Sequence, residues 1–130
     1  MEFAVPFERS FDGAYGLEYL EPTRGRVVVT EALLGSDGTV SSGVYAAIAE
    51  SLASTGTAVE VLEAGFIPSG LSNATYVTGD VRDGELLATA RCRARSHGEW
   101  LWDVEIRPAE GPPAAFATVA IAVRPARPRI

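Results

Sequence analysis

Residues 40–59 decide the fold of this chain, and they read VSSGVYAAIAESLASTGTAV. Apolar and small side chains recur at helical spacing, which predicts a helix from about Ser42 to Ala58, with Ser41 or Ser42 as its N-cap. A surface helix usually carries several charges of both signs, whereas this stretch has only Glu50. A helix so poor in charge is expected to be enclosed, and an enclosed carboxylate is a candidate for chemistry.

One face of this predicted helix is bulky and the opposite face is small. The bulky stripe, expected to pack on a sheet, comprises Val44, Ile48, Leu52, Thr55 and Val59. Glu50 lies about 200° around the helix from Ile48, because each residue advances about 100°. The small residues expected on the side of Glu50 are Gly43, Ala46, Ala47, Ala53, Ser54 and Thr57. Such a face lets a ligand or a second chain approach the carboxylate closely. The alternative is an ordinary solvated glutamate on an amphipathic helix.

Strands are predicted on both sides of the helix. Two precede it, at 15–20 and 26–34, and four follow it, at 72–78, 86–96, 100–107 and 114–123. Residues 65–70, which contain two glycines and a proline, are expected to break the pattern. Tight turns join the late strands, so an antiparallel meander is expected, with the helix buried against one face of the sheet. The whole chain, 1–130, is predicted to be one domain, with an N-terminal segment at 1–12 and a tail at 125–130.

Composition excludes several classes of function. The chain has 130 residues, a formal net charge of −6 and eleven basic residues, all arginine, so a nucleic-acid partner is not expected. The absence of lysine excludes a Schiff-base or phosphate-loop lysine. One histidine and one cysteine are too few for a conventional zinc site, and no cofactor is expected. No apolar run approaches a membrane span, and a lone cysteine fits a reducing compartment, so a cytoplasmic location is expected.

The single cysteine and the single histidine are weak candidates for a thiol hydrolase. Cys92 lies on the small-residue face of its predicted strand, which favours a thiol packed in the core. His97 lies in a turn before Gly98, where a surface histidine is the simpler interpretation. Trp100 and Trp102 share one face of the next strand and are expected to pack in the core or at a subunit contact.

Three arginines are predicted on one strand face. Alternation places Arg91, Arg93 and Arg95 together in an otherwise acidic protein. Because arginine pairs with phosphate in a bidentate manner, these side chains are candidates for binding a ligand that carries phosphate groups. The alternative is a solvated outer sheet face whose arginines balance neighbouring acids.

The helix sequence SSGVYAAIAES, at 41–51, resembles the signature of the hotdog-fold acyl-CoA thioesterases of the 4-hydroxybenzoyl-CoA (Arthrobacter-type) and phenylacetate-pathway group. That signature is His-Gly-Gly-Val-Tyr, a few small residues, then Ala-Glu/Asp-Ser/Thr. The stretch SNATY at 72–76 resembles the Asn-rich strand of the group, and LWDV at 101–104 resembles a later strand. The resemblance implies an α+β hotdog fold, in which a curved antiparallel sheet wraps one long helix, and hydrolysis of an aryl- or medium-chain acyl-CoA.

The resemblance also implies roles for particular residues. Glu50 would be the nucleophile or general base, the backbone N–H of Ser42 or Gly43 would polarise the thioester carbonyl, and the Ser54 hydroxyl would support catalysis. The residues implied to bind substrate are Asn73, Arg95, Ser96 and His97. The chain departs from the signature where His-Gly-Gly is replaced by Ser-Ser-Gly, and it has no glutamine to serve as the helper amide of some members.

Assembly and mechanism follow from the same resemblance. It implies a homodimer or a homotetramer built as a dimer of dimers, with the active site at the dimer interface and coenzyme A present only as part of the substrate. Two alternatives remain. The first is a hotdog protein that binds acyl thioesters without hydrolysing them, as a sensor or pathway accessory. The second is a dehydratase of the same fold, against which the lack of a suitably placed histidine counts.

Overall fold

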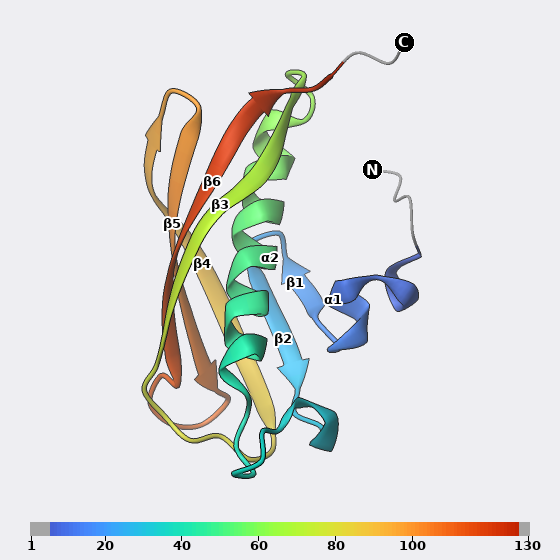
Figure 1. Cartoon of the computed structure of the whole chain (residues 1–130), viewed down its shortest axis with the longest axis vertical. Helices are drawn as coiled ribbons and strands as arrows, with labels where there is room; N and C mark the ends of the chain where they lie inside the picture. The colour runs from blue at the N-terminus through green and yellow to red at the C-terminus, as the bar shows by residue number, and fades with distance from the viewer. Residues whose placement is uncertain (1–5, 128–130) are drawn as a thin grey trace.

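The computed structural model describes residues 6–127, so parts of the predicted end segments, 1–5 and 128–130, lie outside the described residues. The described part consists of one long helix and a six-stranded antiparallel sheet (Figure 1). The elements before the long helix are η1 (Phe7–Arg9), α1 (Phe11–Ala14), β1 (Glu18–Glu21), β2 (Arg24–Val28) and η2 (Glu31–Leu33). The long helix is α2 (Ser42–Val61), and the strands after it are β3 (Phe66–Val77), β4 (Glu85–Ser96), β5 (Glu99–Pro108) and β6 (Ala115–Pro125).

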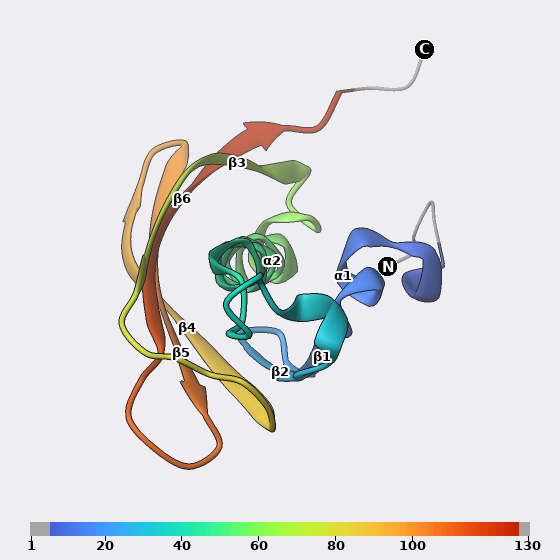
Figure 2. The same ribbon diagram turned by 60° about the horizontal axis from the view of Figure 1, so that its bottom comes forward.

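The sheet curves around α2, which lies on its concave side (Figure 2). Viewed nearly along the helix, the central strands pass on one side of α2, and α1 lies on the side away from them. The predicted α+β architecture, with one long helix wrapped by a curved antiparallel sheet, is confirmed. The helix is one turn longer at its C-terminal end than the sequence pattern indicated.

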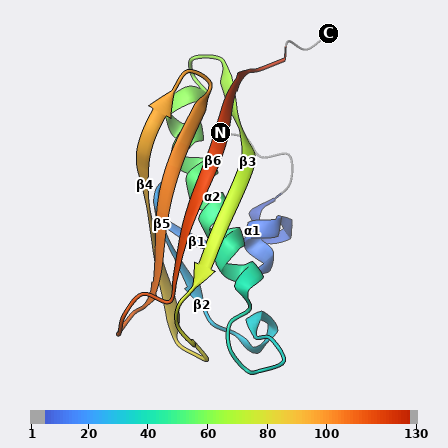
Figure 3. The ribbon, with the colours of Figure 1, turned by 60° about the vertical axis from the view of Figure 1, so that its left-hand side comes forward.

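Strand order differs from the prediction. The order is β1-β2-β4-β5-β6-β3, so only β4, β5 and β6 form the expected meander (Figure 3). β3 pairs with β6 along its length and forms one edge of the sheet. The predicted break at 65–70 is also wrong, because β3 begins at Phe66. Alternation of side chains specifies which face a strand presents to the core, but it does not specify which strand lies beside it.

The helix packs on the sheet through small residues as well as bulky ones. The buried face of α2 comprises Tyr45, Ile48, Ala49, Leu52, Ala53, Gly56, Thr57, Ala58 and Val61. The predicted stripe is therefore correct at Ile48 and Leu52, but Val59 is 54% exposed. Ala53 and Thr57, expected on the small outer face, are buried. A β-carbon at Gly56 would lie 2.6 Å from Trp102 Cη2, so this glycine allows the helix and the sheet to approach closely.

A buried hydrogen-bonded pair fastens α2 to β5. Trp102 Nε1 donates to Thr57 Oγ1 at 3.0 Å, and the Thr57 hydroxyl donates to the carbonyl of Ala53 at 2.8 Å. We expect Thr57→Val to lower the free energy of unfolding by about 1–3 kcal/mol, because valine keeps the shape of threonine but leaves the buried indole N–H without an acceptor. Urea unfolding monitored by tryptophan fluorescence measures this loss.

Thr89→Val is the matched control, since it makes the same exchange on the outer face of β4. We expect this control to change the free energy of unfolding by less than about 0.5 kcal/mol. An equally small change for Thr57→Val would contradict a structural role of the Trp102–Thr57 bond.

Candidate functional site

Glu50 lies in the middle of α2, beside the edge strand β3. A β-carbon at Gly70 would overlap Glu50 Oε1 and lie 3.4 Å from Glu50 Cδ, so the carboxylate rests directly against the Gly70 backbone. Glu50 is nevertheless exposed, so the expectation of an enclosed carboxylate is wrong for a single copy of the chain. The carboxylate therefore has one side against β3 and another side open to a ligand.

Glu50 lines a pocket of about 250 Å³ on the side of α2 that faces α1. The floor of this pocket is made by small side chains of α2, and α1 supplies its opposite side. The lining residues are Phe11, Asp12, Ala47, Glu50, Ser51, Ser54 and Thr55. The structure thus brings Ser54 and Glu50 into one pocket, as the sequence predicts.

The backbone of β3 is irregular next to Glu50. Its pairing with β6 shifts between Gly70 and Ser72, which leaves Leu71 as an extra residue. A glycine beside a strand irregularity commonly marks a place where another group approaches the backbone closely. Here the group is the Glu50 carboxylate, so the local shape of β3 fixes where the carboxylate lies.

Asn73, predicted to bind substrate, makes bonds within the protein. Its side-chain Nδ2 donates to the carbonyl of Ala46 at 2.9 Å, and its Oδ1 accepts from Thr75 Oγ1 at 2.6 Å. Ala46 lies one turn before Glu50 on α2. The amide of Asn73 therefore ties β3 to the helix beside the carboxylate, and its role in binding substrate stays a prediction.

The start of α2 does not reach the pocket of the same chain. Ser42 and Gly43 are exposed and do not line it. No acidic residue occupies the first turn, so the partial positive charge of the helix N-terminus is not offset within α2. Glu50 lies roughly 10 Å along the helix from this end, which is too far for one carbonyl group to contact both.

The predicted arginine face is interrupted by a bulge. Pairing of β4 with β5 shifts between Cys92 and Ala94, and this moves Arg95 to the face opposite Arg91. Arg95 lies over the ring of Trp100, 4.2 Å from its centroid, and pairs with Glu60 of α2 at 2.7 Å. The prediction that all three arginines share a face is wrong, because one inserted residue reverses the alternation of a strand.

The other two residues of the predicted nucleotide site lie at the turn between β4 and β5. The Ser96 hydroxyl donates to the carbonyl of Glu99 at 2.8 Å, which closes the turn, and His97 is exposed. Arg95, Ser96 and His97 are therefore adjacent, but they lie near the C-terminal end of α2 and not at the Glu50 pocket.

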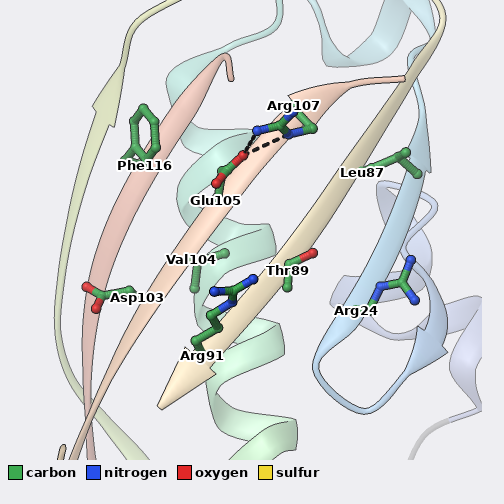
Figure 4. Close-up of a pocket in the computed structure, with 9 residues that line it drawn as sticks. All are labelled: Arg24, Leu87, Thr89, Arg91, Asp103, Val104, Glu105, Arg107 and Phe116. Atoms are coloured by element: carbon green, nitrogen blue, oxygen red, sulfur yellow. Dashed lines mark hydrogen bonds and ion pairs between the residues drawn. The ribbon is translucent and has the colours of Figure 1, made fainter. Parts of the chain in front are cut away.

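A larger hollow, of about 500 Å³, lies on the outer face of the sheet (Figure 4). Its lining residues are Arg24, Leu87, Thr89, Arg91, Asp103, Val104, Glu105, Arg107 and Phe116. Its carboxylates are held by arginines: Arg107 Nε donates to Glu105 at 2.7 Å, and Arg93 Nε donates to Asp103 at 2.8 Å. Arg93 and Thr118 both bond to Asp103, and the hydrogen bond from Arg93 lowers the pKa of that carboxyl group. Because Asp103 and Glu105 are already paired with arginines, the Glu50 pocket is the better candidate for chemistry.

The sequence analysis missed two residues of the Glu50 pocket, Phe11 and Asp12, and it missed Gly70 beside the carboxylate. Phe11 and Asp12 lie in a short segment without periodicity, so no pattern marked them. Gly70 carried a signal, since a glycine inside a strand often marks a close approach, but its segment was interpreted as a break. Among residues 6–127, no group of three or more His, Cys, Asp or Glu side chains is placed to hold a metal ion. No helix in the same range is both long and apolar enough to cross a membrane.

The chain is similar to solved structures of esterases and thioesterases. One is the proposed esterase Rv1847/MT1895 from Mycobacterium tuberculosis, with a TM-score of 0.85 and 30% identity over 91% of this chain and 98% of that one. Another is a mutant of thioesterase PA1618 from Pseudomonas aeruginosa, with a TM-score of 0.84 and 22% identity over 92% and 88% of the two chains. The BH2602 protein from Bacillus halodurans, solved with CoA, has a TM-score of 0.79 and 12% identity over 86% and 74%. No family model matches the chain.

Proposed function

This chain belongs to the hotdog-fold family of esterases and thioesterases, and from this premise we propose that it hydrolyses acyl-CoA thioesters with an aryl or medium-chain acyl group. The observation that carries the proposal is the position of Glu50 at a pocket of about 250 Å³ whose floor is made of small side chains. The CoA bound to the neighbour from Bacillus halodurans supports coenzyme A as the carrier of the acyl group. Coenzyme A enters as part of the substrate, with no separate cofactor, which fits a cytoplasmic location.

The reaction requires one carboxylate and one water molecule. As a general base, Glu50 takes a proton from water while the water oxygen bonds to the thioester carbon. The carbon–sulfur bond then breaks, and the CoA thiolate takes up a proton. As a nucleophile, Glu50 itself bonds to that carbon and expels the thiolate, and water hydrolyses the resulting anhydride. The Ser54 hydroxyl lies in the same pocket and supports either route.

The group that polarises the carbonyl comes from a second copy of the chain in this proposal. The N–H groups of Ser42 and Gly43 lie roughly 10 Å along the helix from Glu50 of their own chain. A carbonyl bound beside Glu50 therefore needs the helix start of a partner, whose N–H groups stabilise developing negative charge. This requirement makes a homodimer the minimum catalytic unit, and a dimer of dimers remains compatible with it.

The edge strand β3 is the surface proposed for this dimer. Its twelve residues pair only with β6 among the described strands, and it exposes large apolar side chains, including Leu71 at 48% and Tyr76 at 67%. A long apolar edge strand is a ready template for pairing with another chain. We expect the double variant Leu71→Glu/Tyr76→Glu to halve the sedimentation mass, because four like charges would meet across a symmetric interface.

Circular dichroism of the same double variant shows whether the fold is retained. If the wild-type protein sediments as a monomer at assay concentrations and still hydrolyses thioesters, the proposal that two chains share one active site would be wrong.

A thiol-release assay over a panel of acyl-CoA esters tests the activity. We expect turnover of aryl or medium-chain esters by the wild-type protein. Calorimetry with the same esters separates the hydrolase from a protein that only binds them. Tight binding of an ester without thiol release would overturn the hydrolase and leave a binding protein.

A further inference from the structure

We propose that α1 (Phe11–Ala14) forms one wall of the acyl pocket, and that Phe11 on this wall selects acyl groups by size. This inference rests on the proposed function, because it assigns the substrate group that the Glu50 pocket receives. It concerns α1, which lies against the long helix on the side away from the central strands (Figure 2).

Phe11 is a large apolar side chain left uncovered at the pocket. It lines the same pocket as Glu50, yet 70% of its surface is exposed. Its ring packs edge-to-face with the ring of Tyr15, with 5.4 Å between the centroids, so Tyr15 supports Phe11 while most of its surface stays open. An apolar ring opposite a carboxylate, with small side chains between them, is suited to the apolar part of a substrate whose reactive end meets the carboxylate.

Asp12 anchors this wall to the long helix. The Ser51 hydroxyl of α2 donates to Asp12 Oδ1 at 2.6 Å. Tyr15 donates to the same oxygen at 3.2 Å, and Tyr19 donates to Oδ2 at 3.3 Å. Tyr19 is also within 2.9 Å of Thr55 Oγ1. One carboxylate therefore joins α1, the start of the sheet and the floor of the pocket.

The tyrosine hydroxyls of this network remain protonated at any physiological pH. Burial raises the pKa of Tyr15, and burial with a contribution from nearby Asp12 raises the pKa of Tyr19 to about 12. Both groups therefore act as hydrogen-bond donors to Asp12 throughout the working range of an enzyme. The two tyrosines therefore keep the protons with which they hold Asp12, and with it the wall, in place.

The size of the pocket favours the acyl group over the nucleotide as its occupant. Pockets that enclose a drug-sized ligand measure about 300–1,000 Å³, whereas this one measures about 250 Å³. The nucleotide of coenzyme A is too large and too highly charged for a space that contains two carboxylates. The acyl group is small and uncharged, and its thioester end must reach Glu50. A second copy of the chain could instead cover Phe11, and the test separates these outcomes.

The test compares Phe11→Ala with wild type on acetyl-CoA, hexanoyl-CoA and phenylacetyl-CoA. We expect kcat/KM for the two larger esters to fall roughly tenfold, while kcat/KM for acetyl-CoA changes less than about twofold, because only the larger groups reach the ring. Phe7→Ala is the matched control: Phe7 lies in the preceding 3-10 helix η1 and is 42% exposed, but it does not line the pocket. This control should leave all three values unchanged.

Asp12→Asn is the second variant, and it keeps Phe11 in place in the sequence. Loss of the charged acceptor for Ser51 loosens the wall, so the preference for larger esters should fall in the same direction as in Phe11→Ala. A double variant should lose little more than either single one, because both changes act through one wall. A merely structural role of Asp12 would lower all three kcat/KM values equally.

Three results separate the possible failures. An equal loss on all esters, or a change in sedimentation mass for Phe11→Ala, would overturn the acyl wall and place Phe11 at a subunit contact. If the wild-type protein binds the esters without turnover, Phe11→Ala must raise the dissociation constants of hexanoyl-CoA and phenylacetyl-CoA and leave that of acetyl-CoA nearly unchanged. If it neither binds nor hydrolyses any of them, both the proposed function and this inference fall.

Discussion

Glu50→Gln should lower kcat/KM for the best acyl-CoA substrate by about 10³-fold while leaving the fold unchanged. Glutamine has nearly the shape of glutamate, but it can neither accept a proton from water nor form an acyl bond, and proton transfer by a positioned group contributes about 10²–10⁴-fold. Glu50 is exposed and forms no part of the buried core, so the free energy of unfolding should not change. Thiol release and urea unfolding measure the two quantities on the same preparation.

Glu63→Gln is the matched control for this substitution. Glu63 is an exposed glutamate just beyond the end of α2, so the variant removes one charge without touching the pocket. It should retain wild-type activity. If Glu50→Gln retained more than about a tenth of wild-type activity, the loss would be below the range expected for a catalytic base, and the assignment of Glu50 would be wrong.

The second large effect is expected at Gly70, on the strand that supports the carboxylate. A methyl group there would overlap Glu50 Oε1, so the Glu50 side chain must move. We expect Gly70→Ala to reduce kcat/KM by about 10²-fold, because a displacement of about 1 Å can cost that much when geometry is required for reaction. Stability should change little, since the carboxylate is the free end of a flexible side chain and Gly70 is on an exposed edge strand.

A double-mutant cycle isolates the contact between Gly70 and Glu50. Aspartate is one methylene shorter than glutamate, so Glu50→Asp should cost less activity in the Gly70→Ala protein than in wild type. Ser69→Ala, at the neighbouring position of β3, is the control for a change in the strand itself and should behave as wild type. Additive losses at the two positions would show that Gly70 does not act through Glu50.

The sequence predicted the long helix well because its signal is local. Charge is nearly absent from residues 40–59, and the side chains on either side of Glu50 are small, so both the helix and the outward direction of Glu50 could be predicted. The contact face was predicted less well, because bulk was taken as the mark of burial. Gly56 and Thr57 are buried precisely where the helix approaches Trp102, and Val59 is left outside.

The errors in the sheet have one physical origin, which is that strand pairing is not local. Nothing within β3, which ends at Val77, indicates that it pairs with β6, which begins at Ala115, and not with β4, which follows it in the sequence. A single inserted residue near Arg93 was enough to move Arg95 to the other face and to pair it with Glu60. Alternation could be followed only as far as the first bulge, and both β3 and β4 contain one.

In the candidate site, too, only the residues that lie close together in the sequence could be predicted to meet. Glu50 and Ser54 lie on one helix at a spacing that brings them together, so the sequence could pair them. Phe11 and Asp12 reach the pocket, and Gly70 reaches the Glu50 carboxylate, from elements distant in the chain, and only the fold brings them together. The helix start could be named as a source of N–H groups, but it lies roughly 10 Å along the helix from Glu50 of its own chain, and for this reason we propose that a partner chain supplies these groups.

A crystal structure of Glu50→Gln soaked with phenylacetyl-CoA tests the central claim most directly. We predict the thioester carbonyl beside the carboxamide at position 50, with the phenyl group against Phe11 and the carbonyl oxygen at the helix start of a partner chain. Density for the ester in the outer-face hollow at Arg91, with the Glu50 pocket empty, would contradict the account.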